Sequence, residues 1–247
     1  MRVLGVIPAR LGSTRLPNKP LQMLAGEPLI TRVIQRVQEH GLVDKLVVAT
    51  DSPMVAQVVE RSSVRALLTG RGHVTGTDRV AEVAARQEFA AFDMIINVQG
   101  DEPFLVREAL AGAIERVSQG DDIGTAAAPV DSALADDPAR VKVVTDARGR
   151  ALYFSRAAIP HLREAADLNP RLYWQHLGLY AYTRQALRRW SSLEPSPAER
   201  AERLEQLRAL HHGLRIGVAF LAEPVEPGVD TPDDLRRAEA HWHALQR

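Results

Sequence analysis

Three basic side chains lie close together near the N-terminus, in the segment PARLGSTRLPNKP that spans residues 8–20. Arg10, Arg15 and Lys19 directly follow the apolar run Val3–Pro8, which predicts a buried strand. In open α/β sheets, ligands bind beyond the carboxyl ends of the strands, where this loop begins. Together with the amide and hydroxyl donors of the loop, the three cations suit an anion such as a phosphate. A solvated charged loop would have the same composition, so both interpretations stay open.

Two aspartates stand where a carboxylate can reach a ligand at that edge of a sheet. Asp101 comes shortly after the predicted buried strand Met94–Val98, beside a glycine. Asp230 lies in the segment GVDTP, residues 228–232, directly before Thr231-Pro232. Aspartate also forms turns and caps helices, and Asp230 precedes a predicted helix. Position alone therefore leaves a structural role open for each of them.

Short apolar runs alternate with amphipathic segments along the chain, which is typical of an α/β protein with a mostly parallel sheet. The predicted strands are Val3–Pro8, Asp44–Thr50, Met94–Val98, Ile123–Pro129, Val141–Thr145, Ala151–Ser155, Leu177–Tyr182 and Ile216–Leu221. The predicted helices are Leu29–His40, Met54–Arg61, Thr77–Arg86, Arg107–Ser118, Ala198–Leu210 and Thr231–Leu245. No repeat or linker interrupts this pattern, so we expect a single domain over residues 1–247.

Composition narrows the class of protein. The 31 basic residues balance 31 acidic ones, so nothing indicates a nucleic-acid groove or a membrane-facing basic surface. Cysteine is absent, which excludes disulfides, thiolate nucleophiles and Cys-ligated metals. The first apolar run is too short for a signal peptide or a membrane span, so we expect a cytoplasmic protein. The missing GxGxxG and GxxxxGK[ST] patterns disfavour a nicotinamide dehydrogenase and a P-loop NTPase.

The basic loop resembles the P-A-R-x-x-S-T-R-L-P-x-K-P signature of the 3-deoxy-manno-octulosonate cytidylyltransferases. Further blocks similar to that family follow in the same order: VQGDEP at 98–103, YFSR at 153–156, HLGLYAY at 176–182, LEQLR at 204–208 and GVDTP at 228–232. The resemblance covers essentially the whole chain. It implies a Rossmann-like nucleotidyltransferase fold, with a mostly parallel three-layer sheet and a small antiparallel element for substrate binding and homodimer formation.

The resemblance also implies an activity and a set of site residues. CTP and 3-deoxy-manno-octulosonate would give the CMP-sugar and pyrophosphate, which activates the sugar for lipopolysaccharide synthesis. The family's pattern makes Arg10, Arg15, Lys19, Asp101 and Asp230 the catalytic residues, with Mg²⁺ bound by the two aspartates. The residues implied to bind CTP are Ala9, Arg10, Ser13, Arg15, Lys19, His73, Gly76, Thr77 and Arg79. Those implied to bind the acid sugar are Gln99, Arg156, His176, Tyr180, Glu205 and Gln206.

Two of these sugar residues have a competing interpretation. Glu205 and Gln206 are predicted on the polar side of the helix Ala198–Leu210, where such side chains are commonly just solvated. His176 and Tyr180 lie four residues apart on a predicted strand, so their side chains face the same way.

The segment 69–79 (TGRGHVTGTDR) departs from the family's pattern. It keeps His73, Gly76, Thr77 and Arg79, but it has Thr75 in place of serine and lacks an acidic residue before His73. The hydroxyl at position 75 is retained, whereas the missing acid leaves the details of base recognition open.

Two other functions remain as alternatives. One is the activation of a different acid sugar, such as an 8-amino analogue of the octulosonate. The other is a nucleotide-binding module without catalysis. Retention of both candidate metal acids and all three loop cations argues against the module, because binding alone has no need of Asp230.

Overall fold

The computed structural model describes residues 1–167, 169 and 171–245, and these cluster into two compact units. The first unit comprises Met1–Leu105 and the C-terminal segment from Glu226 onward. The second unit comprises Val106–Val225. The single domain expected from the sequence stays a prediction.

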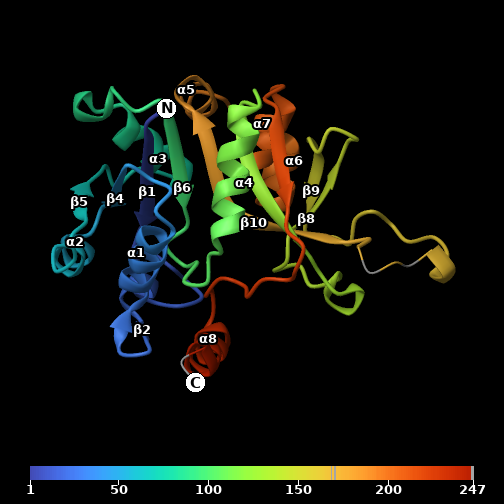
Figure 1. The fold of residues 1–247 in the computed structure, drawn as a ribbon, viewed down its shortest axis with the longest axis horizontal. Helices are drawn as coiled ribbons and strands as arrows, with labels where there is room; N and C mark the ends of the chain where they lie inside the picture. The colour runs from blue at the N-terminus through green and yellow to red at the C-terminus, as the bar shows by residue number, and fades with distance from the viewer. Residues whose placement is uncertain (168, 170, 246–247) are drawn as a thin grey trace. The chain divides into compact units, whose positions relative to one another are not determined.

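The first unit contains a sheet of four parallel strands in the order β6-β1-β4-β5 (Figure 1). Every residue of β1 is buried, as expected for a parallel strand that is covered on both faces. Helix α3 packs on β1, β4 and β6, and α2 packs on β4 and β5. The strands are β1 (Val3–Ala9), β4 (Lys45–Thr50), β5 (Arg65–Leu68) and β6 (Met94–Val98), with an antiparallel hairpin of β2 (Met23–Leu24) and β3 (Glu27–Pro28). The helices are α1 (Leu29–His40), α2 (Pro53–Val59), α3 (Gly76–Ala84) and α8 (Pro232–Leu245), with 3₁₀ turns η1 (Lys19–Leu21) and η2 (Gln87–Phe89).

A separate apolar cluster attaches the C-terminal helix to the basic loop. Leu16 from the loop, Phe104 and Val229 are all buried in it, with Ala238 of α8 beside them. This cluster joins chain segments that are far apart in the sequence. It therefore places the loop, the end of β6 and the start of α8 near one another within the first unit.

The second unit is built around β7, which pairs in parallel with β11 and antiparallel with β10. Strand β8 pairs antiparallel with both β10 and β9. Helix α4 packs on β7, β10 and β11. The strands are β7 (Ile123–Pro129), β8 (Lys142–Thr145), β9 (Ala151–Ser155), β10 (Trp174–Thr183) and β11 (Ile216–Phe220). The helices are α4 (Arg107–Ser118), α5 (Arg184–Ser191), α6 (Pro197–Glu202) and α7 (Gln206–His211), with 3₁₀ turns η3 (Ser132–Leu134) and η4 (Ala165–Asp167).

The predicted α/β class, with a mostly parallel sheet and a smaller antiparallel element, is confirmed. The single helix predicted over Ala198–Leu210 is wrong. Arg203 has left-handed backbone angles (φ 55°), which end α6 and separate it from α7. Strand β5 and helix α5 were not predicted. Strand β5 has only four residues, whereas Ala186, Leu187 and Trp190 do give α5 an apolar face at helical spacing.

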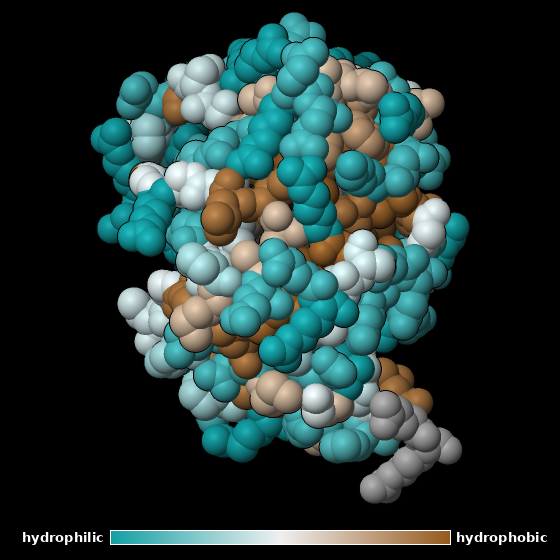
Figure 2. Space-filling view, turned by 90° about the vertical axis from the view of Figure 1, so that its left-hand side faces the viewer, coloured by the Kyte–Doolittle hydropathy of each residue, from teal (hydrophilic) through white to brown (hydrophobic). Residues whose placement is uncertain are grey.

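The surface is mainly polar around this apolar interior. Figure 2 shows one face on which hydrophilic side chains predominate, with smaller apolar patches among them. Within the described residues, no helix has both the length and the apolar composition needed to cross a membrane.

A close contact between α4 and β7 yields a test of the packing in the second unit. A Cβ atom placed on Gly124 of β7 would lie 1.9 Å from the carbonyl oxygen of Ala113 in α4. Because backbone cannot move aside cheaply, Gly124→Ala should lower the free energy of unfolding by about 1–3 kcal/mol. Urea denaturation measures the loss. Gly72→Ala is the control, since nothing lies within 4 Å of its Cβ position, and equal midpoints for the two variants would contradict the packing argument.

Candidate active site

A pocket of about 280 Å³ lies in the first unit at the carboxyl end of β1. Its walls come from the loop after β1, the segment leading into α3, the turn after β6 and the segment before α8. The lining residues are Pro8, Ala9, Arg10, Gly12, Ser13, Thr14, Arg15, Lys19, Pro20, His73, Thr75, Gly76, Arg79, Gln99, Gly100, Asp101 and Asp230. Many of the residues predicted to bind CTP are therefore together in one cavity.

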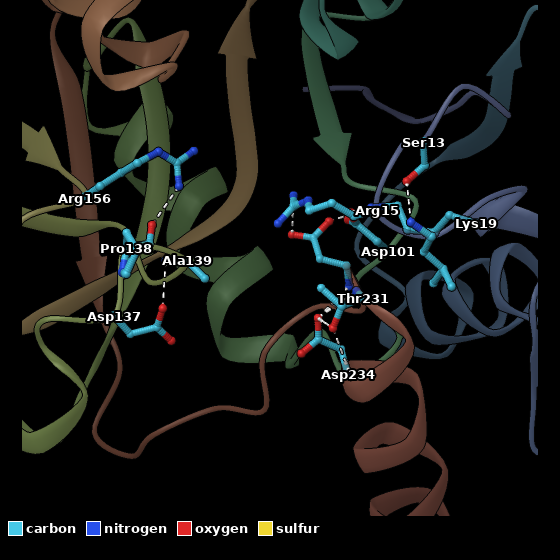
Figure 3. A network of polar contacts seen from close by, with 12 residues as sticks. Ser13, Arg15, Lys19, Asp101, Asp137, Pro138, Ala139, Arg156, Thr231 and Asp234 are labelled. Carbon is cyan, nitrogen blue, oxygen red and sulfur yellow. Dashed lines mark hydrogen bonds and ion pairs between the residues drawn. The ribbon is translucent and has the colours of Figure 1, made fainter.

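The basic loop is anchored at a few points and leaves its arginines accessible. Leu16 is buried, and its backbone N–H donates to the hydroxyl of Ser13 at 3.3 Å (Figure 3). Arg10 and Arg15 are exposed, while both line the pocket. The loop thus has a fixed backbone path, and its guanidinium groups can meet an anion from solvent.

Lys19 contacts both aspartates that are predicted to bind the metal. Its ammonium group donates to a carboxylate oxygen of Asp101, and to Oδ1 of Asp230 at 2.8 Å. Arg15 Nη2 lies 3.0 Å from the other oxygen of Asp230 (Figure 3). Burial alone would lower the pKa of Lys19, but the charges of Asp101 and Asp230 and their hydrogen bonds raise it. Lys19 therefore stays a cation, and the structure brings together four charged residues from three distant segments.

The start of α8 explains why the carboxylate of Asp230 is available to the pocket. Thr231 and Asp234 cap this helix: the Thr231 hydroxyl accepts from the Asp234 N–H at 3.2 Å. In return, Asp234 Oδ2 accepts from the N–H groups of Thr231 at 2.8 Å and of Asp230 at 3.1 Å (Figure 3). The capping role considered for Asp230 from the sequence thus belongs to its neighbours.

The two aspartates fit a magnesium ion that shares its ligands with a nucleotide. Among the described residues, no group of three or more His, Cys, Asp or Glu side chains could hold a metal by itself. Mg²⁺ commonly takes one or two carboxylates and completes its shell with phosphate oxygens and water. Asp101 and Asp230 already converge on one cation, the ammonium group of Lys19, so their placement suits such a site.

Glu102 stands beside this pair without adding negative charge at neutral pH. Burial, followed by the charges of Asp101 and Asp230, raises the pKa of Glu102 to about 8, although the charge of Lys19 lowers it in part. Gly228 leaves room for this side chain, because a Cβ there would lie 3.0 Å from Glu102 Oε1.

The segment before α3 is organised around residues that sequence reasoning linked to the base. Arg79 is almost fully buried, and its guanidinium pairs with Asp51 at 2.8 Å and with Thr69 Oγ1. This arginine therefore holds the segment in place as well as lining the pocket. Gly76 lines the pocket, whereas Thr77 is fully buried and does not line it.

The second unit holds five of the six residues predicted to bind the acid sugar, whereas Gln99 lines the pocket of the first unit. Arg156 follows β9 and is held by backbone carbonyls. Its Nε donates to Glu202 O at 2.8 Å. Its Nη1 donates to Pro138 O at 2.7 Å (Figure 3). The backbone N–H of Arg156 donates to the Glu202 carboxylate at 3.0 Å. Together these contacts fix the position of the Arg156 side chain.

Three of the other implied sugar residues, His176, Tyr180 and Gln206, are buried, while Glu205 is half-buried. The rings of His176 and Tyr180 on β10 lie 5.4 Å apart, as their spacing predicts. Burial lowers the pKa of His176 to about 3 and raises the pKa of Tyr180 well above its usual value. Gln206 at the start of α7 is also buried, which excludes the competing interpretation of a solvated side chain for this residue. Neutral hydrogen-bonding groups of this kind suit a ligand rich in hydroxyls.

Comparisons with known proteins agree with this geometry. A family model described as cytidylyltransferase matches residues 4–216. A relative in Gemmatimonas aurantiaca, named 3-deoxy-manno-octulosonate cytidylyltransferase, is 57% identical over 99% of this chain and 96% of its own length. A relative of the same name in Methylococcus capsulatus is 47% identical over 96% of this chain and 95% of its own. This chain belongs to the 3-deoxy-manno-octulosonate cytidylyltransferase family. The resemblance carried by the sequence motifs is thereby confirmed.

Solved structures agree with the family. The CMP:2-keto-3-deoxy-manno-octonic acid synthetase complexed with CTP superposes with a TM-score of 0.91 at 38% identity, covering 99% of this chain and 100% of that one. The 4-diphosphocytidyl-2C-methyl-D-erythritol synthase of Anaerococcus prevotii, at 12% identity and a TM-score of 0.63 over 100% of this chain and 99% of that one, shares the fold.

One residue that was not predicted from the sequence contacts the segment before α3. Glu82 of α3 accepts from His73 Nε2 at 2.5 Å and from the Gly70 N–H at 2.9 Å. A carboxylate therefore does lie beside His73, although residues 69–72 directly before it include no acidic residue. Helical spacing places Glu82 one turn after Asp78 on α3, but only the folded loop brings His73 onto it.

The Glu82 contacts predict a pH dependence. Burial would raise the pKa of Glu82, but hydrogen bonds from His73, Gly70 and Arg86 outweigh it and lower the pKa to about 2. Folding therefore favours the ionised form, so this contribution to stability is complete above pH 4.5 and is lost as pH falls towards 2. Glu82→Gln should unfold at lower urea concentration than the unmodified protein at neutral pH, and the difference should shrink as the solution is acidified below pH 4.5.

Glu60→Gln, at an exposed glutamate of the same unit, is the control. A difference for Glu82→Gln that stayed constant over this pH range would contradict the assignment.

Proposed function

We propose that this protein transfers the cytidylyl group of CTP to 3-deoxy-manno-octulosonate and releases pyrophosphate. The observation that carries the proposal is the pocket at the end of β1, where Arg15, Lys19, Asp101 and Asp230 form one charged cluster. Membership of the family supports the choice of nucleotide and sugar.

The reaction needs positioning and charge neutralisation more than covalent chemistry. The anomeric hydroxyl oxygen of the sugar attacks the α-phosphorus of CTP, a new C–O–P linkage forms, and the bond between the α-phosphorus and the bridging oxygen breaks. The hydroxyl proton passes to water, and the electron pair of the broken bond leaves with pyrophosphate. Arg10, Arg15 and Lys19 stabilise the negative charge that grows on the departing phosphates.

Asp101 and Asp230 would hold Mg²⁺ in this scheme. When bound, the ion supplies further neutralisation of the phosphates and lowers the pKa of the attacking hydroxyl. Lys19 contacts both aspartates, so it keeps their carboxylates oriented toward the same point. Ala9, Ser13, His73 and Gly76 line the rest of the CTP pocket.

The acid sugar is assigned to Arg156, which offers a guanidinium for its carboxylate, and to a set of neutral groups for its hydroxyls. That set is His176, Tyr180 and Gln206 of the second unit. The sugar-binding roles implied for Glu205 and Gln99 stay predictions. The proposal includes a cytoplasmic homodimer that serves lipopolysaccharide synthesis. Exposed Leu152 and Tyr153 on β9, which are 62% and 37% accessible, are consistent with a partner surface on the antiparallel element.

The function is tested by pyrophosphate release from each of the common ribonucleoside triphosphates, with magnesium and with or without 3-deoxy-manno-octulosonate. We expect release only when CTP and the sugar are both present. Release with a second nucleotide would show that the His73 segment does not select cytosine. No release with any nucleotide would contradict the proposed function.

The metal assignment predicts that Asp101→Asn and Asp230→Asn each reduce turnover by roughly 10²–10³-fold, the scale of losing one electrostatic group at a transition state. Removal of one charge leaves the size of the side chain unchanged, so the fold should persist. Steady-state rates at several magnesium concentrations measure the effect. Asp233→Asn, on the exposed start of α8, is the matched control. Normal turnover by either pocket variant would show that its carboxylate is not needed for the metal.

A further inference from the structure

Thr125, a residue that sequence reasoning did not single out, lies next to His176 in the second unit. It is fully buried on β7. Its hydroxyl oxygen is 2.9 Å from His176 Nε2, 2.7 Å from the carbonyl oxygen of Leu179 and 3.4 Å from that of Leu177. A single hydroxyl thus contacts both a histidine ring and a main-chain carbonyl.

An irregularity in β10 creates this arrangement. Leu177 pairs with Ala126 and Ala181 pairs with Gly124, so three residues of β10 stand opposite Thr125 alone. In such a bulge the extra residues leave the regular ladder, and their carbonyls become available to side chains. The Leu179 carbonyl is one of these, and Thr125 is its neighbour across the two strands.

The two short contacts define the proton positions. A carbonyl oxygen only accepts, so the 2.7 Å contact with Leu179 uses the one proton of the Thr125 hydroxyl. The 2.9 Å contact with His176 is then a hydrogen bond only if the ring nitrogen donates. Nε2 of His176 therefore carries the proton, and Nδ1 has a free lone pair.

The choice of tautomer matters because this ring is neutral. Burial holds the pKa of His176 at about 3, so at neutral pH the ring carries one proton that can occupy either nitrogen. Phe154 packs edge-on at 4.9 Å and Tyr180 lies at 5.4 Å, so the ring is confined by its neighbours.

We propose that Thr125 is a positioning residue that holds His176 as the Nε2–H tautomer, so that Nδ1 accepts a hydrogen bond from a hydroxyl group of the acid sugar. This inference rests on the proposed function, because it takes the sugar as the ligand of His176. An accepting nitrogen selects a hydroxyl over an ether or a deoxy carbon at that position of the substrate. The specificity of His176 would thus be decided by a threonine on a different strand.

The direct test is ¹⁵N NMR of the side-chain nitrogens of the full chain with labelled histidine. The chain has eight histidines, and a His176→Gln variant identifies the signals of His176. In the free protein we expect a protonated Nε2 and an unprotonated Nδ1. T125S keeps the hydroxyl and should keep this pattern, whereas T125V, which preserves the shape and removes the hydroxyl, should lose the single tautomer.

A proton on Nδ1 in the unmodified protein, or a T125V spectrum identical to it, would overturn the inference. Neither result depends on substrate, so neither says anything against the proposed function.

Kinetics then test the link to the sugar. T125V should raise KM for 3-deoxy-manno-octulosonate by roughly 2- to 12-fold, the scale of one neutral hydrogen bond, with KM for CTP unchanged and T125S close to normal. An unchanged KM for the sugar in T125V would overturn the assignment of Nδ1 to a sugar hydroxyl. If the unmodified protein formed no CMP-sugar, the proposed function itself would fail, and the NMR result would still report the tautomer.

Discussion

The ion pairs between Lys19 and the two aspartates are the interaction on which the first unit's site depends. Charged groups that lose contact with water must be paired, because an isolated buried charge is very costly. Lys19 is only 17% exposed, and Asp101 and Asp230 supply its counter-charges. This requirement draws together a loop after β1, a turn after β6 and the segment before α8. The same pairing holds both carboxylates at one point of the pocket, as a shared divalent cation would require.

Backbone capping elsewhere leaves the charged side chains available for this task. Thr231 and Asp234 satisfy the first turn of α8, and Thr75 with Asp78 forms a capping box at the start of α3. Since these residues satisfy the free N–H groups of their helices, the neighbouring Asp230 is not used as a cap. The carboxylate of Asp230 can therefore face the pocket, while the first turn of α8 is still capped.

The two units differ in the physical character of their polar groups. The first unit collects full charges of both signs, which suits a triphosphate with its metal. The second unit buries His176 and Tyr180 with pKa values that keep both neutral, and it anchors Arg156 through backbone carbonyls. Neutral donors and acceptors around one guanidinium suit a carboxylate that carries hydroxyls. This division agrees with the two different chemical halves of the proposed reaction.

The sequence by itself determined the class of fold, the family and many of the residues that line the pocket. Strand and helix periodicity are local, so α1 and α4 were predicted to the residue, and motif order identified the family before any distance was known. Only the tertiary structure decided the break at Arg203, the burial of Gln206 and the pairing of Glu82 with His73. Glycine or asparagine at position 203 would have indicated a left-handed residue and the end of a helix, but arginine gives no such signal. Pairings such as these join side chains whose separation depends on how loops and strands pack, and packing is a property of the whole chain rather than of any segment.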